Sequence, residues 1–509
     1  MLCIVDLFES ISLEGLSQNI LAQVLEVETT PWVQSTIPAV DRTDKLPLGL
    51  AQERLWFLSQ LEPDSPFYTV AIALHLHGSL NAAILDQSLQ ALLQRHEVLR
   101  TSFEWCEGRP IQVIHSSLSP GLEINLVQKD SETDLQALIL QEAQQPFDLS
   151  QPPLLRGTLL EVSEQEHLFL LTFHHIIADG WSIGVFIQEL AALYEACSQG
   201  RSSPLPELPI QFLDFAAWQR QWLQTEHFKT QLNYWLQQLS GNLPALQLKF
   251  DRDRPAIQTY AGRKHPIAFS QEIAQSLKVL SRTAGTTLFM TLLAAFYALL
   301  YSNTPQNDIL IGSPIAGRNQ PQTTGLIGFF INTLVLRADL SGNPSFLDLL
   351  ARVRTVALGG YAHQDIPFEK LVEALRPQRS LSYNPLFQVM FIFQNTAIPT
   401  VELPGLTFCP QEVDGGTSKF DLKLSLWEAA EGLAGSLEYK TDLFNSATIA
   451  KMVEQLEQLL VQVTTQPTIK LDELAAQLTR GDHPPPDGNR SIANQQKLKF
   501  AKRKVISAI

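Results

Sequence analysis

The chain has 509 residues, of which 45% are hydrophobic and 17% are charged, and its net charge is −15. This length allows about two to four compact units, and the composition predicts a folded core rather than a disordered chain. The negative charge argues against nucleic acid as the main partner, because phosphate binding requires clustered Lys and Arg, and it suits a soluble, cytoplasmic protein.

The N-terminal residues carry one helix signal. Five apolar residues recur at helical spacing over 12–24, which predicts an amphipathic helix. Residues 26–45 contain Pro31 and Pro38 without a clear hydrophobic period, and we expect a linker there. The first residues lack a basic region and a long apolar run, so no signal peptide is predicted.

From residue 46 the pattern is dense and globular. We expect a helix over 51–61, a strand over 69–77, a helix over 82–96 and two strands between 101 and 115. A helix over 134–144 and an apolar strand over 167–177 follow, and the next helix begins at Ser182. Trp218, Trp222 and Trp235 lie on further helical segments after a proline-rich loop.

The second part of the globular region also mixes helices and strands. We expect helices over 271–284 and 288–301, strands over 309–313 and 330–337, two late alternating strands over 420–439, and a last helix over 446–464. The apolar helix over 288–301 is shorter than the roughly 20 residues of a membrane span, so it is predicted to be a core helix. Two α/β halves, divided between 225 and 265, are the expected organisation, without a membrane segment.

The C-terminal segment differs in composition. Beyond Gly488, which follows the prolines at 484–486 and Asp487, the chain carries six Lys or Arg residues and no acidic residue. We expect residues 475–509 to form a basic, disordered tail. A docking tail for an acidic partner chain is the alternative.

The run His174-His175-Ile-Ile-Ala-Asp179-Gly180 is the candidate for chemistry. An imidazole at the end of an apolar strand can accept a proton near neutral pH. Asp179 could contact that imidazole, or pair with an arginine and hold the loop, and Gly180 leaves room for a ligand. A structural histidine pair is the alternative. Zinc is disfavoured because no further ligand cluster accompanies the pair, and the four cysteines form no Cys-x-x-Cys motif.

Six other blocks accompany this motif, and together they resemble the condensation domain of nonribosomal peptide synthetases over residues 46–474. Seven blocks in the family's order are far more specific than one. Three positions depart from the family pattern, Gly49, Phe212 and Ser380, which puts local packing in doubt. The blocks are Ala-Gln-Glu-Arg-Leu-Trp-Phe-Leu at 51–58, Arg-His-Glu-Val-Leu-Arg-Thr-Ser-Phe at 95–103, the histidine motif with Trp-Ser at 174–182, Asp-Phe-Ala-Ala-Trp at 214–218, Ile-Gly-Phe-Phe-Ile-Asn-Thr at 327–333, His-Gln-Asp-Ile-Pro-Phe-Glu at 363–369 and Asn-Pro-Leu at 384–386.

The resemblance implies a mixed α/β fold similar to chloramphenicol acetyltransferase. Two subdomains, 46–225 and 226–474, would form a V around a central tunnel. Donor and acceptor carrier proteins would present their thioesters from opposite ends, and the acceptor amine would attack the donor thioester to form a peptide bond. No cofactor would be bound covalently, because the partner carriers supply the phosphopantetheine arms.

The same resemblance implies roles for individual residues. His175 would be the working imidazole, acting as a base or only orienting the amine, while His174, Asp179 and Gly180 shape the site. Asp179 would form a structural ion pair, with Arg318 as the preferred partner and Arg54 as the second choice. Backbone amides near Gly180 would stabilise an oxyanion. Three residues would contact substrate in the tunnel, although turn or strand capping is an equal alternative for the last two: Trp181, Ser313 and Asn332.

Relatives within the superfamily leave alternatives open. The sequence Asp-Gly-Trp-Ser-Ile-Gly-Val at 179–185 is most similar to members that take an L-configured donor. An epimerisation-type relative and a non-catalytic platform that only docks carriers are the competing interpretations. Residues 1–25 resemble the end of a carrier domain, with an ordinary leading helix as the alternative.

Overall fold

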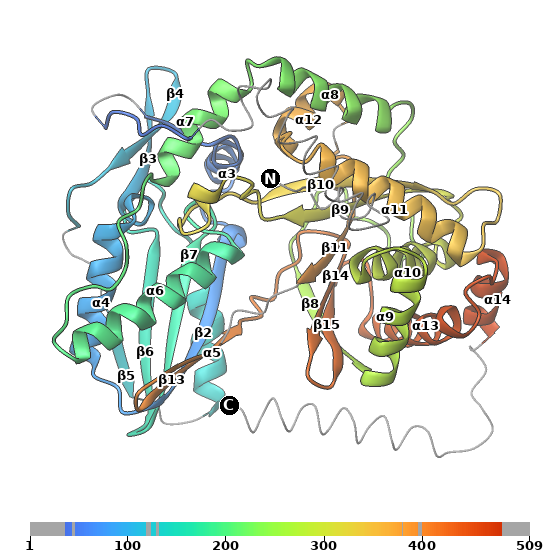
Figure 1. The fold of residues 1–509 in the computed structure, drawn as a ribbon. Helices are drawn as coiled ribbons and strands as arrows, with labels where there is room; N and C mark the ends of the chain where they lie inside the picture. The colour runs from blue at the N-terminus through green and yellow to red at the C-terminus, as the bar shows by residue number, and fades with distance from the viewer. Residues whose placement is uncertain are drawn as a thin grey trace, which may run out of the picture.

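The structure is a computed structural model that describes residues 36–42, 46–118, 124–128, 132–378, 380–394 and 400–480. The helix predicted at 12–24, the segment 1–25 that resembles a carrier domain, and the basic tail beyond residue 480 lie outside the described residues. Figure 1 shows two α/β halves side by side, each built on a six-stranded sheet.

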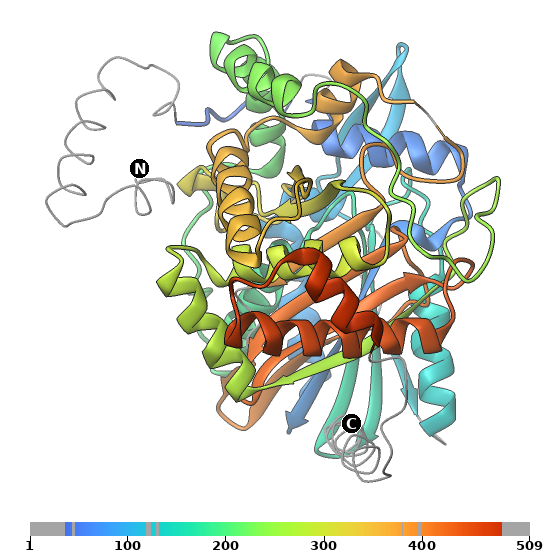
Figure 2. The same cartoon turned by 90° about the vertical axis from the view of Figure 1, so that its right-hand side faces the viewer.

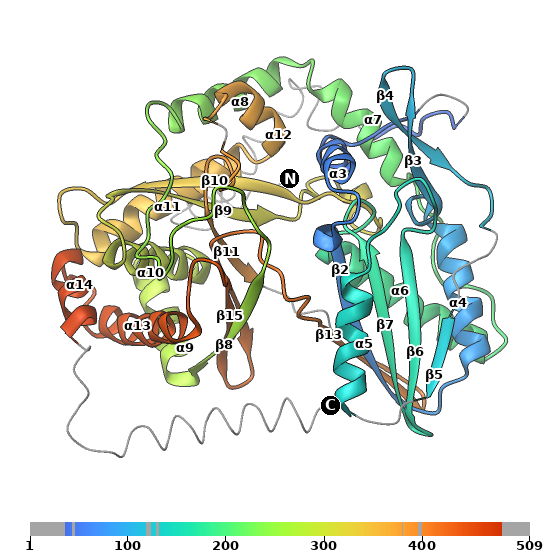
Figure 3. The ribbon, with the colours of Figure 1, turned by 180° about the vertical axis from the view of Figure 1, so that it is seen from behind.

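The first half is a sheet in the order β12-β13-β2-β7-β6-β5 with helices on both faces. Helices α4 and α6 lie on one face (Figure 1), and α5 covers the other (Figure 3). The central strand β7 is buried along most of its length, which explains why its sequence is an unbroken apolar run. A small sheet, β1-β4-β3, stands beside this half. The elements are β1 (Leu46–Pro47), α3 (Leu50–Leu61), η1 (Pro66–Tyr68), β2 (Thr69–Gly78), α4 (Ala82–Arg95), η2 (Glu97–Arg100), β3 (Thr101–Cys106), β4 (Arg109–Ile114), β5 (Ile124–Gln128), α5 (Glu132–Gln144), β6 (Leu155–Ser163), β7 (Glu166–His174), α6 (Gly180–Ser198) and α7 (Phe212–Trp222).

The second half is a sheet in the order β10-β9-β11-β14-β15-β8. Its helices α9, α10, α13 and α14 cover the side of the sheet that faces away from the first half, as Figure 2 shows. The remaining elements of the chain, of which β12 and β13 belong to the first sheet, are α8 (Glu226–Gln238), β8 (Gly262–Ser270), α9 (Gln271–Thr283), α10 (Leu288–Ser302), β9 (Asp308–Ile315), η3 (Pro321–Thr323), β10 (Asn332–Asp339), α11 (Phe346–Ala362), α12 (Phe368–Leu375), β11 (Val389–Gln394), β12 (Val401–Leu403), β13 (Leu406–Glu412), β14 (Leu422–Ala429), β15 (Gly432–Lys440), α13 (Ser446–Thr465) and α14 (Leu471–Arg480).

Helix α10 is the most apolar helix of the second half, and its residues Met290–Leu300 are all buried in the core, as predicted. No single helix in the described part of the chain is both long and apolar enough to cross a membrane. Only α9 and α10 taken together reach the required length, by length and composition alone, and they meet at an angle of 105°.

Two segments of the second half pack into the first half. The first is the bridge segment, residues 316–331 between β9 and β10, whose Leu326, Ile327, Phe329 and Phe330 belong to the core of the first half. The second is the pair β12 and β13, which joins the first sheet beside β2. Both segments come after residue 225 in the chain, so a single division near that residue does not separate the two halves of the structure.

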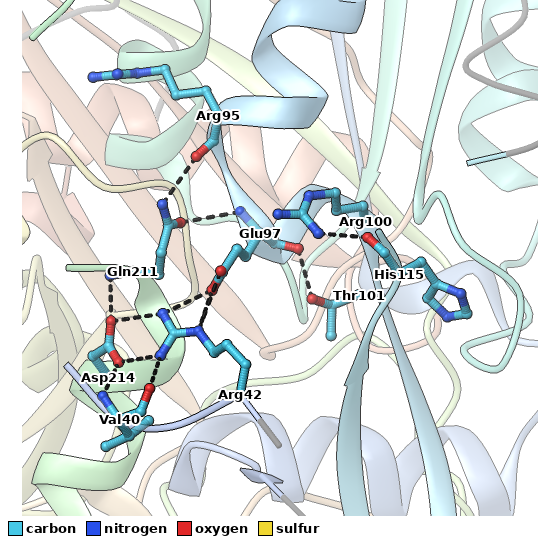
Figure 4. A network of polar contacts seen from close by, with 9 residues as sticks. All are labelled: Val40, Arg42, Arg95, Glu97, Arg100, Thr101, His115, Gln211 and Asp214. Carbon is cyan, nitrogen blue, oxygen red and sulfur yellow. Dashed lines mark hydrogen bonds and ion pairs between the residues drawn. The ribbon is translucent and has the colours of Figure 1, made fainter. Parts of the chain in front are cut away.

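Residues 36–42 were predicted to be linker, but they are packed against the fold. Ile37 is 1% exposed, and its N–H donates to the side chain of Gln322 at 2.8 Å. Arg42 joins two acidic residues of the first half, with Nη1 2.6 Å from Asp214 and Nε 3.0 Å from Glu97 (Figure 4). An extended segment of this kind has no hydrophobic period, so the sequence did not predict that Ile37 and Arg42 anchor it to the fold.

The predicted start of the tail at residue 475 is also wrong for its first residues. Helix α14 continues to Arg480, and both Leu474 and Leu478 are buried in the core of the second half. The helix shows an apolar face only when Leu471, Leu474 and Leu478 are taken together, at the three- and four-residue spacing of an amphipathic helix.

Candidate functional site

The histidine motif forms the connection from β7 to α6. Strand β7 ends at His174, earlier than the predicted end at Ile177, and α6 begins at Gly180 rather than at Ser182. The N–H of His175 donates to the carbonyl of Tyr68 at 2.7 Å, which fixes the start of the connection. The side chains of Ile176 and Ile177 are fully buried beneath it. These two apolar side chains therefore anchor a loop and are not a continuation of the strand.

The hydrogen bond of the His175 ring determines which nitrogen is available for chemistry. Nδ1 lies 2.8 Å from the carbonyl oxygen of Ala178. A carbonyl oxygen only accepts, so Nδ1 carries the hydrogen and Nε2 carries the free lone pair of the neutral ring. Phe329 contacts the same ring edge-on, with ring centroids 5.0 Å apart. His175 is thus a hydrogen-bond acceptor held in one orientation.

His174 has the opposite tautomer. The backbone N–H of Ile176 donates to its Nδ1 at 3.1 Å, so Nδ1 is unprotonated and the neutral ring carries its hydrogen on Nε2. The side chain is buried, and Phe147 packs edge-on against it. This arrangement suits a residue that shapes the loop. In the described ranges, no group of three or more His, Cys, Asp or Glu side chains is placed to hold a metal ion.

Burial lowers the pKa of both histidines to about 3. The positive charge of Lys419 contributes to the low pKa of His175, and the neighbouring His175 and Lys419 contribute to that of His174. Both rings are therefore uncharged at neutral pH. An imidazole with so low a pKa is a weak proton acceptor but still an effective hydrogen-bond acceptor.

The low pKa values predict acid-sensitive stability. Between pH 6.5 and 3 the unfolded chain binds protons that the folded protein excludes, so stability is lost as the pH falls. Two such histidines should lower the free energy of unfolding by about 2 kcal/mol between pH 6 and pH 5. Urea unfolding at the two pH values measures this loss. In His174→Gln the loss should be roughly halved, and an unchanged pH dependence in this variant would refute the assignment.

Asp179 holds the end of the motif against the bridge segment. One carboxylate oxygen accepts from the N–H of Ser182 at 2.8 Å and caps α6, and the other accepts from the N–H of Phe330 at 2.9 Å. Arg318 completes the set, with Nη2 3.4 Å from Oδ1. Of the two roles open from the sequence, the structure has the arginine pair, while the imidazole of His175 donates to Ala178.

Arg318 is enclosed as completely as its partner. Its side chain is 2% exposed, and burial lowers its pKa from the usual value although Asp179 opposes this effect. The guanidinium donates to Ser182 Oγ at 2.6 Å and to the carbonyl of Leu326 at 2.8 Å, and it lies 4.0 Å from the ring centroid of Phe330. The pair thus joins the motif of the first half to the bridge segment of the second.

Arg54, the second choice as a partner of Asp179, is paired elsewhere. Its Nη1 lies 3.2 Å from Glu369 Oε1, which connects α3 to α12. Position 54 faces the second half from α3, so its charge is used at the contact between the halves and the second-choice prediction is wrong.

Gly180 and Trp181 begin α6 at its exposed end. A Cβ atom on Gly180 would meet nothing within 4 Å, so there is open space at this position. Trp181 is 48% exposed, and its indole N–H donates to the carbonyl of Thr324 in the bridge segment at 2.9 Å.

A cavity of about 630 Å³ lies between the halves, bounded by α3, α7, the bridge segment and the start of α12. Asn332 is among its lining residues, whereas Trp181, Ser313 and His175 are not. Phe329 lines the cavity and also contacts His175. This ring therefore stands between the cavity and the imidazole of His175.

The contacts of Asn332 and Ser313 are those of structural residues. Asn332 donates to the carbonyls of Gln364 and Ile366 at 3.0 and 2.7 Å and accepts from the N–H of Phe368 at 2.9 Å, so it caps the first turn of α12. Ser313 is 3% exposed within β9, opposite Leu334 of β10. Asn332 therefore has the capping role that the sequence left open as the alternative to substrate contact.

Lys419 was not singled out in the sequence, yet it lies beside the paired histidines. Its Nζ is 4.5 Å from the ring centroid of Tyr68 and 5.1 Å from that of Phe67. Burial lowers the pKa of Lys419 to about 7. The residue lies between β13 and β14, far along the chain from the motif, and no local pattern connects the two.

Three comparisons with known proteins identify the family and the fold. Residues 42–481 match the family model of the Condensation domain. A linear gramicidin synthase of Brevibacillus parabrevis is 46% identical over 475 residues, which is 92% of this chain but only 6% of that protein. A complex of the X-domain and OxyB from teicoplanin biosynthesis contains a chain that matches with TM-score 0.79 and 30% identity, covering 86% of this chain and 98% of that one. The first condensation domain of the calcium-dependent antibiotic synthetase, in complex with a substrate analogue, has the same fold, with TM-score 0.72 and 21% identity over 84% and 99% of the two chains.

Proposed function

The chain belongs to the condensation-domain family of nonribosomal peptide synthetases, and from this membership we propose that it forms peptide bonds between carrier-bound substrates. A donor acyl or peptidyl thioester and an acceptor aminoacyl thioester would each be held on the phosphopantetheine arm of a carrier protein. The observation that carries the proposal is the free lone pair on Nε2 of His175, held by the bond from Nδ1 to Ala178.

The proposed reaction needs no covalent intermediate on the protein. The acceptor nitrogen attacks the donor carbonyl carbon, the carbon–sulfur bond breaks, and the proton lost by nitrogen ends on the departing thiol. Nε2 of His175 accepts a hydrogen bond from the amine and aligns its lone pair. Because its pKa is about 3, we assign it mainly an orienting role. Holding both reactants in place can supply roughly 7–11 kcal/mol of the barrier reduction.

The start of α6 is the proposed site for the developing oxyanion. The cap formed by Asp179 takes the N–H of Ser182, which leaves the N–H groups of Gly180 and Trp181 to face a ligand at the positive end of the helix dipole. The open space at Gly180 admits the reacting carbonyl. Backbone donors fixed in this way stabilise charge that appears only in the transition state.

The experiment uses two carrier proteins, one loaded with a donor acyl group and one with an aminoacyl acceptor. We expect a dipeptidyl thioester on the acceptor carrier, detected by mass spectrometry, and only background levels without the protein. Running the reaction in D₂O separates the epimerisation alternative, because that activity would introduce deuterium at the donor Cα. Carriers that remain unchanged at saturating protein would refute condensation.

A docking platform is the second candidate. It is favoured by the X-domain relative, whose solved structure is a complex with OxyB. A platform would bind carriers without converting their thioesters, so binding measured by titration together with no product in the loading assay would select it. The intact His175 geometry supports the catalytic candidate instead. An L-configured donor stays a prediction from the sequence at 179–185.

A further inference from the structure

Lys419 reaches from the second half to the histidine motif of the first. It follows β13 and precedes β14, and its ammonium group lies on the ring faces of Phe67 and Tyr68 in η1. Tyr68 is itself part of the site, because its carbonyl accepts the N–H of His175 at 2.7 Å and its ring lies 6.4 Å from that of His174. The lysine charge is therefore held close to both imidazoles by aromatic rings.

Among the described residues, the ammonium group of Lys419 is in contact with aromatic rings and not with a carboxylate. Within the described ranges, no carboxylate lies within 4.0 Å of Lys419 Nζ and no hydrogen bond from Nζ to the protein is formed, although the backbone carbonyl of this residue accepts from Asn384. Glu438 is the acidic residue whose charge raises the pKa of Lys419, and its carboxylate lies 2.6 Å from Nζ of Lys423. The charge of Lys419 is therefore not cancelled by an adjacent carboxylate and can act on the neighbouring imidazoles.

The titratable groups that surround this cation are mostly positive or neutral. Of the two acidic ones, Glu438 is paired with Lys423 and Glu62 is exposed. A proton added to either imidazole would therefore place a second positive charge beside Lys419, which is unfavourable in a poorly solvated site. The surrounding groups are Arg54, Glu62, Tyr68, His174 and His175 from the first half, and Tyr260, Lys423 and Glu438 from the second.

We propose that Lys419 is a positioning residue of the reaction, whose positive charge acts together with burial against protonation of both imidazoles and favours the uncharged, nucleophilic form of an amine placed beside His175. The part that concerns the amine rests on the proposed function, whereas the part that concerns the imidazoles does not. An α-amine has an ordinary pKa of about 7.7–8.0, so much of it is protonated and unreactive near pH 7. A neighbouring cation shifts that balance toward the free amine.

The first test follows the histidines without any substrate. In ¹³C-histidine-labelled protein, with His175 assigned from a His175→Gln sample, we expect the His175 signal to shift near pH 7 as Lys419 loses its charge, while the ring stays uncharged. Lys419→Arg should remove this shift, because arginine keeps its charge. Lys419→Met should raise the pKa of His175 by about one unit or more. Identical titrations in all three proteins would overturn the proposal.

The second test measures amide formation from pH 6 to pH 9. Lys419→Met should be about tenfold slower than the unmodified protein at pH 6 and near its rate at pH 9, because a one-unit rise in amine pKa matters only where the amine is protonated. Lys419→Arg should keep the rate at pH 6. Lys278→Met, on the outer helix α9 and paired with Glu428, is the matched control and should follow the unmodified profile.

The two tests separate the possible failures. An equal loss at every pH in Lys419→Met would indicate a purely structural role and would overturn the proposal. Absence of product with the unmodified protein would refute the proposed function, and the substrate-free titration would still decide whether Lys419 controls the imidazoles.

Discussion

Replacing His175 with alanine is expected to slow amide formation by about 10²-fold, the cost of misplacing a reacting group by about 1 Å, because the amine loses the Nε2 acceptor that orients it. The free energy of unfolding should change by less than about 1 kcal/mol, because the loop is anchored by Ile176 and Ile177 and not by the imidazole. The rate is measured in single turnovers with both carriers loaded, and the stability by urea unfolding.

A second substitution separates the two ring nitrogens. In His175→Asn the side-chain amide can replace Nδ1 as the donor to Ala178, but nothing replaces Nε2. We expect this variant to be nearly as slow as His175→Ala. His115→Ala is the control, since His115 bonds to Ser102 at 2.9 Å away from the motif and should leave the rate unchanged. A fast His175→Asn variant would show that Nε2 is not required.

Asp179→Ala should destabilise the protein by about 3–5 kcal/mol, because it leaves the charge of Arg318 buried without its partner. The same change removes the acceptor for the N–H groups of Ser182 and Phe330, so the start of α6 and the bridge segment lose a shared anchor. Activity should be lost as well, since the loop that holds His175 is no longer fixed. Urea unfolding at pH 7.5 measures the stability.

A double-mutant cycle shows whether the lost stability comes from the ion pair of Asp179 and Arg318. Arg318→Met in the Asp179→Ala background should add little further destabilisation, because the unpaired charge is then removed. The partly exposed pair of Arg337 and Asp308, 2.8 Å apart, is the control and should contribute less than about 1 kcal/mol. If Asp179→Ala were inactive yet as stable as the unmodified protein, Asp179 would have to act in the chemistry and not in the fold.

Local sequence patterns predicted correctly those elements whose structure depends mainly on their own residues. Helix α10 was recognised because an apolar run of its length requires a buried helix, and the strand before the motif because its residues are apolar on both faces. The end of that strand was misplaced for the same reason. Ile176 and Ile177 continue the apolar run, but they pack beneath the loop that carries His175.

Features that depend on distant contacts had no local signal. The pairing of Asp179 with Arg318 was expected only through a family resemblance, and the position of Lys419 was not expected at all. The protonation pattern of the two histidines follows from the Ala178 carbonyl and the Ile176 N–H, which depend on loop geometry and not on residue type. The histidine motif alone therefore predicts only part of the site.

The position of β13 beside β2 has a consequence for how the chain is made. Leu406 pairs with Gly78, so the partner of the β2 edge is synthesised about 330 residues later. At translation rates of about 5–20 residues per second, that edge waits roughly 20–60 seconds for its neighbour. Unpaired edges invite association with other chains. Newly made first halves, crowded together on one messenger RNA, would therefore be the stage at which this protein is most exposed to aggregation and most dependent on chaperones.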